Sequence, residues 1–276
     1  MIMERTIEPK FTEPGFRERL KGMLGVDFYR LFHTPMYYIF LAVAAIIPAM
    51  VLSMGGMGAE SGVNPLYANT WNIIAADKPL YIMNNMGDYA NMNMVFIFGG
   101  IMVSIFIGHD YTSGYVKQLF TTHAKKRDYM MSKTIVGAFS MACMCGTYLL
   151  GSLMAGVITG LSMNVNFGSL LIAILGKMVM SLGWSSLYTF LNVIFRRHFG
   201  ISIASCFFLG TGIPVIGAAA VLGNTSALNI FLYGASVYAC LSSNLMTLLV
   251  CLAVSAAWTV IYNVLGSAVL AHSDVY

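Results

Sequence analysis

The 276-residue chain is 58% hydrophobic and only 9% charged, with a mean hydropathy of +0.75 and a formal net charge of +4. Soluble domains carry about a quarter of their residues as charges, so this composition excludes an ordinary soluble protein and indicates a membrane protein. The small positive charge is explained by basic loops beside apolar segments, so no nucleic-acid partner is expected.

The Lys and Arg residues are distributed very unevenly. Thirteen of the fifteen fall in three clusters: six before His33, five between Lys117 and Lys133, and the pair at 196–197. No charged residue other than histidine occurs between Arg197 and Asp274. Hydrocarbon excludes charge and cytoplasmic loops collect Lys and Arg. The pattern therefore predicts an all-α, multi-pass protein of the bacterial inner (cytoplasmic) membrane with both termini in the cytoplasm.

The N-terminal region divides into two parts. Residues 1–15 are expected to form a cytoplasmic tail. Residues 16–33 are predicted to form an amphipathic helix on the inner leaflet, with basic residues toward anionic headgroups. Its apolar residues recur at helical spacing, at Phe16, Leu20, Met23 or Leu24, Phe28 and Leu31.

Residues 34–276 are predicted to form a single transmembrane domain of six spans. A helix needs about 20 apolar residues to cross about 30 Å of hydrocarbon. The stretches that meet this requirement are 35–54, 91–108, 134–160, a fourth that ends at 195 and begins near 168 or near 177, 201–222 and 245–270.

Two segments are expected on the outer side. Residues 55–90 form the one sizeable outer loop. The apolar stretch 228–240 has thirteen residues, too few to cross, so 224–244 is predicted to be a re-entrant or interfacial segment before the last span. The alternative is a further span, which would move the C-terminus outside.

The loop 109–133 between spans two and three is the most informative polar segment. Asp110 lies where the second span meets water and is expected to cap the following helix. Tyr111, Tyr115 and Leu119 recur at i, i+4 and i+8, which gives a short helix one apolar-aromatic face. So short a loop offers that face no packing partner, which favours burial in a cleft of a soluble protein. The alternative is a solvated basic loop that only sets orientation.

Few residues within the spans carry chemistry. Lys177 is the only strongly ionisable candidate, and it is expected to reach the outer headgroups. Alternatively, it lies on a substrate path together with Pro214, which would kink the fifth span. Gly156 and Gly160 have the GxxxG spacing of closely packed helices.

The motifs of enzymes are missing from the sequence. There is no GxxxxGK[ST], HExxH or CxxC pattern and no cluster of carboxylates. No cofactor, metal or catalytic residue is therefore expected in this chain. The lack of carboxylates within the predicted spans also disfavours an ion-coupled transporter.

One segment and the N-terminal helix resemble a known family. Between spans two and three, the chain is similar to type-two ABC exporter permeases at Asp110, Ser113-Gly114, Lys117, Arg127, Tyr129 and Ser132-Lys133. Residues 27–34 (DFYRLFHT) resemble the start of bacterial members, where a connecting helix on the membrane surface runs into span one. The likeness extends over the whole chain and is closest to permeases that export bacteriocins, lantibiotics or other peptides. Tyr115 after Gly114 and the lack of a proline before Arg127 depart from the common pattern.

The resemblance implies a non-catalytic half-transporter. It would pair with a second permease, identical or paralogous, and with two cassette ATP-binding subunits that bind ATP and magnesium. The coupling helix seated in an ATPase subunit would comprise Asp110, Tyr111, Gly114, Tyr115, Lys117, Leu119 and Phe120. The substrate would be amphipathic or hydrophobic. The rival functions are a secondary transporter or channel, and a membrane sensor or assembly protein.

Overall fold

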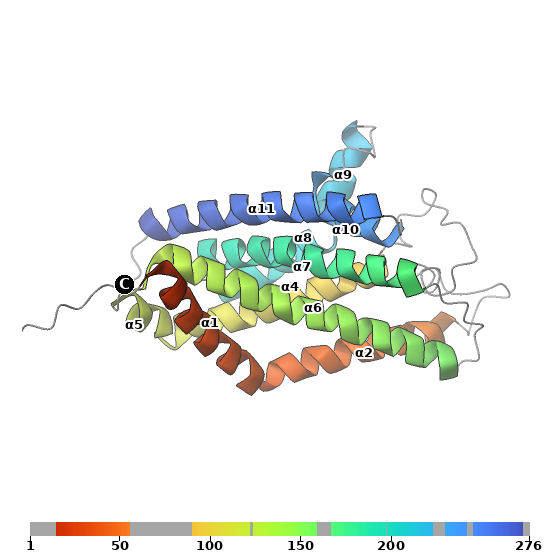
Figure 1. The fold of residues 1–276 in the computed structure, drawn as a ribbon, viewed down its shortest axis with the longest axis horizontal. Helices are drawn as coiled ribbons and strands as arrows, with labels where there is room; N and C mark the ends of the chain where they lie inside the picture. Colours follow the sequence, from red (N-terminus) through yellow and green to blue (C-terminus); the bar gives the residue numbers. More distant parts are fainter. Residues whose placement is uncertain are drawn as a thin grey trace, which may run out of the picture.

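A computed structural model describes residues 15–55, 90–121, 124–158, 167–196, 198–222, 230–241 and 245–272. These residues form an elongated bundle of helices (Figure 1). The helices are α1 (Phe16–His33), α2 (Pro35–Gly55), α4 (Ala90–Thr112), α5 (Tyr115–Thr121), α6 (Lys126–Ile158), α7 (Phe167–Ile194), α8 (Phe199–Gly210), α9 (Ile213–Leu222), α10 (Leu232–Leu241) and α11 (Leu245–His272).

The predicted all-α, multi-pass class is confirmed. Four helices, α4, α6, α7 and α11, are long and apolar enough to cross a membrane. α1 and α2 meet at a bend of 65° and would add a fifth span if they are counted together. The bounds of α1 equal the predicted 16–33, and α2 begins at the predicted Pro35. The count of six spans stays a prediction.

The predicted fifth span is not one continuous helix. α8 ends at Gly210 and α9 begins at Ile213. Between them Gly212 has a φ of +72°, a left-handed conformation that favours glycine. Pro214 has no N–H to donate to the carbonyl four residues earlier, so the helix breaks just before the predicted kink. In Figure 1, α9 projects away from the bundle.

α10 is too short to cross a bilayer, in agreement with the prediction for 228–240. It has ten residues and packs against α7 and α11. Trp258 of α11 donates its indole N–H to the carbonyl of Ile230, 2.8 Å away, beside the start of α10. The re-entrant assignment of 224–244 stays a prediction, and most of the outer loop 55–90 lies outside the described residues.

The core lies where α6 and α7 pack between α2, α4 and α11. Its largest fully buried aromatic side chains include Phe96, Tyr148, Trp184 and Tyr188. Buried polar groups also join helices, as is usual in membranes where apolar burial alone gives little driving force. Asn192 of α7 donates to Ser104 of α4 at 3.0 Å.

The close approach of helices occurs at Gly151 of α6. A Cβ atom there would collide with the backbone carbonyl of Ala45 in α2. Gly156, predicted as a packing residue, also lies in α6, and its partner Gly160 falls outside the described residues. A small residue is therefore required at Gly151, five residues before the first glycine of the GxxxG pattern.

Gly151→Ala should therefore lower the melting temperature in detergent, because the backbone of α2 cannot yield as a flexible side chain could. Gly146→Ala is the matched control on the same helix. The nearest atom to its Cβ is Met178 Cε at 3.9 Å, so this change should be neutral or stabilising by up to about 1 kcal/mol. Equal melting temperatures for the two variants would contradict the proposed α2–α6 contact.

Candidate functional site

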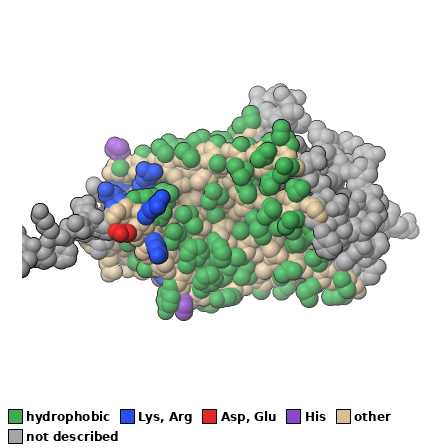
Figure 2. Space-filling model, viewed as in Figure 1, with side chains coloured by type: hydrophobic (Ala, Val, Ile, Leu, Met, Phe, Trp, Pro, Cys, Tyr) green, Lys and Arg blue, Asp and Glu red, His purple; other side chains and the backbone are tan. Residues whose placement is uncertain are grey.

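Charged side chains gather at one end of the bundle (Figure 2). This end is formed by α1, α5, the end of α4 and the start of α6. Among the described residues, Lys177 of α7 is the one Lys, Arg, Asp or Glu placed well inside a helix away from this end. The charged end is the only part of the described chain where acidic and basic groups meet, so the candidate site is built there.

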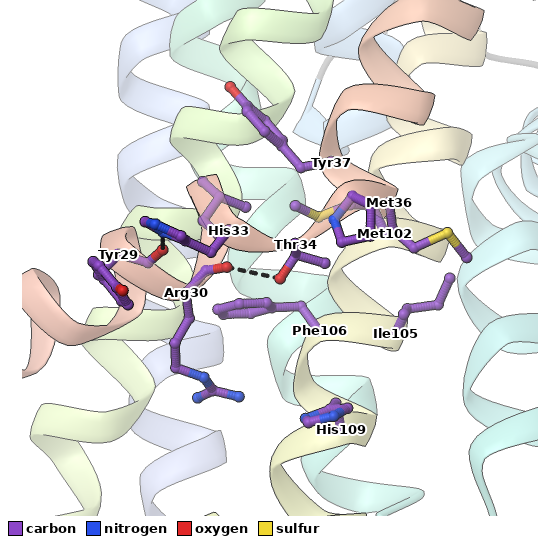
Figure 3. Close-up of a pocket in the computed structure, with 12 residues that line it drawn as sticks. Tyr29, Arg30, His33, Thr34, Met36, Tyr37, Met102, Ile105, Phe106 and His109 are labelled. Carbon is purple, nitrogen blue, oxygen red and sulfur yellow. Dashed lines mark hydrogen bonds between the residues drawn. The ribbon is translucent and has the colours of Figure 1, made fainter.

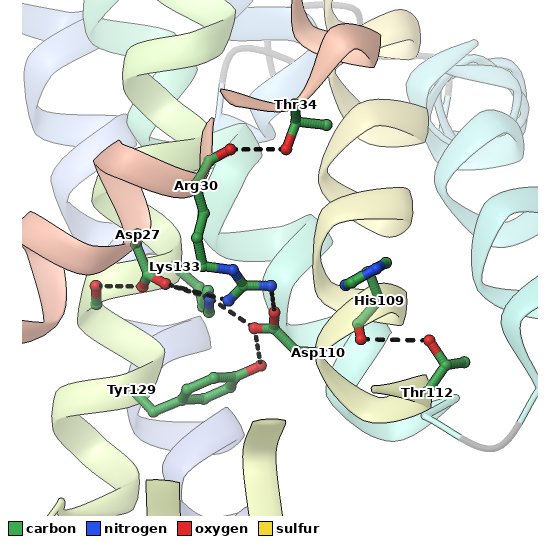
Figure 4. A network of polar contacts seen from close by, with 9 residues as sticks. Asp27, Arg30, Thr34, His109, Asp110, Thr112, Tyr129 and Lys133 are labelled. Carbon is green, nitrogen blue, oxygen red and sulfur yellow. Dashed lines mark hydrogen bonds and ion pairs between the residues drawn. The ribbon is translucent and has the colours of Figure 1, made fainter. Parts of the chain in front are cut away.

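Lys133 of α6 is the centre of this site. Its side chain is fully buried, and its Nζ lies 2.6 Å from Asp27 Oδ1 of α1 and 2.6 Å from Asp110 Oδ2 of α4 (Figure 4). Both carboxylates are also buried. Buried ions are tolerated only when they are paired and hydrogen-bonded, so these three charges fix α1, α4 and α6 relative to one another.

Arg30 balances the second carboxylate. Its Nη2 donates to Asp110 Oδ1, and its Nη1 lies 3.7 Å from Asp27. Two hydroxyl groups of α6 complete the cluster: Tyr129 donates to Asp110 at 3.2 Å and Ser132 to Asp27 at 2.7 Å. We call Asp27, Arg30, Asp110, Tyr129, Ser132 and Lys133 the ionic cluster. It carries two positive and two negative charges and is thus neutral as a whole.

The predicted capping role of Asp110 is wrong. α4 continues to Thr112, so Asp110 lies in its last turn and its carboxylate turns into the ionic cluster. An anion near a helix C-terminus is unfavourable, and the two cations compensate for this. The chain reverses at Gly114, whose φ of +73° is left-handed, and α5 begins at the next residue.

α5 contacts the ionic cluster through Tyr115. Its ring centroid lies 4.4 Å from the Arg30 guanidinium carbon and 5.6 Å from Lys133 Nζ, within cation–π range. Burial raises the pKa of the Tyr115 hydroxyl, and the negative charges of Asp27 and Asp110 raise it further, against the opposing effect of Arg30. The phenol therefore stays neutral, and the face of its ring attracts the two cations through cation–π interactions.

The expectation that the aromatic face of this loop lacks a packing partner is wrong. Tyr111, Leu119 and Phe120 pack against a second apolar cluster formed by Met23, Val116, Tyr129, Met130, Val193 and Leu270. What α5 exposes is instead polar: Lys117, Gln118 and Thr121, next to the exposed Ser113 of the preceding turn. The apolar face anchors α5 to the bundle, and the polar face is exposed.

The basic run 125–127 is not simply solvated. Lys126 donates to the carbonyl of Leu270 at the end of α11, where a cation is favoured by the helix dipole. Arg127 lies over the ring of Phe16, 5.8 Å from its centroid. Lys125 and Arg127 are exposed, as expected of a solvated run, and Lys126 is partly buried. A further ion pair, Arg19 to Asp128 at 2.8 Å, joins α1 to the start of α6.

Lys177 does not reach the outer surface as expected. Its side chain is fully buried, and its Nζ lies 5.5 Å from the centroid of the Phe96 ring. Lys177 is buried because α7 begins at Phe167, so that Lys177 lies about three turns inside the helix and not near its end. Lys177 and Pro214 are both remote from the ionic cluster along their helices, and a shared substrate path stays a prediction.

Sequence reasoning noted Tyr129, Lys133 and residues 27–34 only for their family resemblance and gave none of them a role in the site. A further signal was available: Asp27 lies one helical turn from both Met23 and Leu31, so it interrupts the apolar stripe of α1. A charge in such a stripe requires a buried partner of opposite sign. Sequence periodicity cannot reveal which residue that partner is.

The fold and the site define a multi-pass membrane protein whose apolar helices are tied together at one end by a neutral ionic cluster. The sequence model described as ABC-2 family transporter protein matches residues 24–212, more than half of the chain. The chain therefore belongs to the ABC-2 family, whose members are membrane components of ABC transporters and work in general with ATP-binding subunits. The matched range includes every member of the ionic cluster. A comparison with curated protein sequences gave no match.

Lys133→Gln should lower the stability of the purified protein sharply. It leaves Asp27 and Asp110 buried with Arg30 as their remaining cation, and breaking a buried pair costs about 3–5 kcal/mol. Melting followed by size-exclusion chromatography in detergent measures the effect. The exposed Lys125→Gln is the matched control.

The double change Asp27→Asn with Lys133→Gln removes one charge of each sign and should recover part of the loss. If Lys133→Gln melts like Lys125→Gln, or if the double variant is less stable than the single one, the ionic cluster does not support the fold as described.

Proposed function

We propose that this chain is the transmembrane permease subunit of an ATP-driven ABC exporter, with ATP hydrolysis in separate cassette subunits. The observation that carries the proposal is the link from α5 through the ionic cluster to α1, α4 and α6. The chain has no phosphate-binding motif of its own, so the energy would arrive through a contact with another protein.

The proposed docking element is the turn and helix from Asp110 to Phe120. Its exposed side chains Ser113, Lys117 and Gln118, together with the exposed Thr121 that follows it, would contact the ATPase subunit. Asp110, Gly114 and Tyr115 would act behind this surface, because they hold α5 on the bundle. Leu119 and Phe120 pack beneath it and would make the helix move as a unit with α6.

Coupling would proceed through charge pairs that resist separation. A displacement of α5 moves Tyr115 against Arg30 and Lys133, and each of these cations is held by a carboxylate on a different helix. Separating them in a dry interior is costly, so the helices should move together rather than one at a time. The cluster thus supports rigid transmission from the partner to the spans.

The substrate class is inferred from what the spans contain. The described carboxylates, Glu18, Asp27, Asp110 and Asp128, all lie at the charged end, which leaves the rest of the described spans without an acidic ion-coupling group. An amphipathic or hydrophobic substrate, such as a peptide or an antimicrobial compound, suits these apolar helices. Lys177 and Pro214 are proposed to lie on its path, and a second permease subunit would complete that path.

The charged end is proposed to face the cytoplasm, on the basis of its Lys and Arg content. In a background without the five native cysteines, Ser113→Cys should react with an impermeant maleimide only after cells are permeabilised. Ser61→Cys, in the predicted outer loop, should react in intact cells. Labelling of Ser113→Cys but not Ser61→Cys in intact cells would reverse the orientation.

The coupling assignment is tested by two variants of α5. Lys117→Glu with Gln118→Ala alters only exposed side chains, so its melting temperature should be unchanged. Co-purification of the cassette ATPase that binds the wild-type chain should fall about tenfold, for a loss of about 1.4 kcal/mol at an interface.

Tyr115→Ala should lower stability and transport together, since it removes the ring from both cations. Lys125→Ala is the control, because it removes an exposed charge outside α5. Normal ATPase binding and transport in the Lys117/Gln118 variant, or an equal defect in Lys125→Ala, would reject α5 as the docking element.

A further inference from the structure

A cavity of about 430 Å³ lies at the bend between α1 and α2, beside α4 (Figure 3). Its size falls within the range of about 300–1,000 Å³ that is usual for small-molecule sites. We call it the elbow cavity. Its walls come from the last turn of α1, the first turn of α2 and the C-terminal half of α4.

The lining of the elbow cavity is divided by chemistry. Arg30, His33, Thr34 and His109 supply basic and polar groups, and Met36, Met102 and Ile105 are among the apolar residues. No Asp or Glu is among the described residues that line it. This combination complements a molecule with an anionic head and an apolar tail.

Two of the basic side chains keep hydrogen-bonding capacity for such a head. His33 Nδ1 lies 2.7 Å from the carbonyl oxygen of Tyr29. A carbonyl only accepts, so Nδ1 carries a proton and Nε2 is the atom left to meet a ligand. In the neutral ring Nε2 only accepts, so it donates to an anion in the imidazolium form, which the negative charge of a bound phosphate favours. Nη1 of Arg30 lies 3.7 Å from Asp27 but makes no hydrogen bond within the described part of the chain, so a phosphate oxygen could accept one from it.

The elbow cavity also lies where α1, a helix with several charged residues, meets the apolar helix α2 (Figure 1). Exposed tyrosines stand around the bend: Tyr29 is 64% exposed and Tyr38 is 53% exposed. Tyrosine is enriched at the level of lipid headgroups, where one end of the side chain is wet and the other apolar. α1 adds the exposed Arg17 and Lys21, which attract anionic lipid to this side of the molecule.

We propose that the elbow cavity binds one anionic phospholipid. Its phosphate contacts His33, His109 and Arg30, and its first acyl segment lies along Met36, Met102 and Ile105. The lipid fills the angle between α1 and α2 and holds that bend. This site is separate from the docking surface of α5 although it shares Arg30 with the ionic cluster, and lipid binding can be measured whether or not the proposed transport function holds.

Photo-crosslinking in lipid nanodiscs tests the proposal with the full chain. p-Benzoylphenylalanine replaces Tyr29, which lines the cavity, or Tyr38, an exposed tyrosine at the same bend that does not line it. The nanodiscs mix phosphatidylglycerol with phosphatidylcholine, and mass spectrometry identifies the adducts. The proportion of phosphatidylglycerol adducts should be about fivefold higher at Tyr29 than at Tyr38, as expected for one additional cationic contact.

Charge variants separate the cavity from general attraction to the surface. His33→Gln with His109→Gln should reduce the proportion of phosphatidylglycerol adducts at Tyr29 to the proportion at Tyr38. Lys21→Gln weakens only the general attraction to the surface, so the fivefold difference between Tyr29 and Tyr38 should persist. A monodisperse elution profile and, for the histidine variant, unchanged adducts at Tyr38 show that the variants are folded.

Three results would overturn the proposal. The first is equal lipid ratios at Tyr29 and Tyr38. The second is an equal effect of Lys21→Gln and the double histidine variant. The third is crosslinking of Tyr29 mainly to a second copy of the chain, which would assign the elbow cavity to a subunit interface.

Discussion

The burial of Lys133 constrains the whole charged end of the molecule. An ammonium group with no exposed surface is tolerable here because carboxylates from α1 and α4 each lie 2.6 Å away. Those carboxylates are buried as well, and without Arg30 the cluster would carry a net negative charge. Removing any one of the four charged members leaves an uncompensated charge in a medium that cannot solvate it. The position of α1 is therefore set by ion pairs as well as by apolar packing.

α5 depends on this arrangement. A helix of seven residues is far shorter than the 12–15 or so that an isolated helix needs in water, so its conformation comes from packing. Val116 is buried and Tyr115 lies over the two cations of the ionic cluster. These contacts fix the buried side of α5 to the bundle, so the exposed polar side has a fixed orientation. A docking element needs this property, since a mobile loop would absorb a partner's movement rather than transmit it.

The sequence predicted the elements better than their contacts. The bounds of α1 followed from its apolar spacing and from the proline that opens α2, both of which are local properties. The pairing of Asp27 with Lys133 joins residues 106 positions apart, and no local pattern specifies it. The prediction for Lys177 was wrong for a related reason. Its distance from the end of the helix depends on where α7 begins, and the uncharged residues before Lys177 did not mark that start in the sequence. The packed face of α5 also depends on residues from distant helices, notably Met23 and Leu270.

Arg30 belongs to both the ionic cluster and the elbow cavity, and this gives the two sites a shared residue. Its Nη2 is committed to Asp110, while its side chain also lines the cavity. A phosphate bound there would compete with Asp110 and Asp27 for the same guanidinium. If a bound lipid changes the stability of the Arg30–Asp110 pair, a rearrangement of that pair must change the free energy of lipid binding by the same amount. This holds because coupling between two sites is reciprocal. The bend between α1 and α2 and the ionic cluster beneath α5 are therefore coupled through one side chain, with no need for a longer chain of contacts.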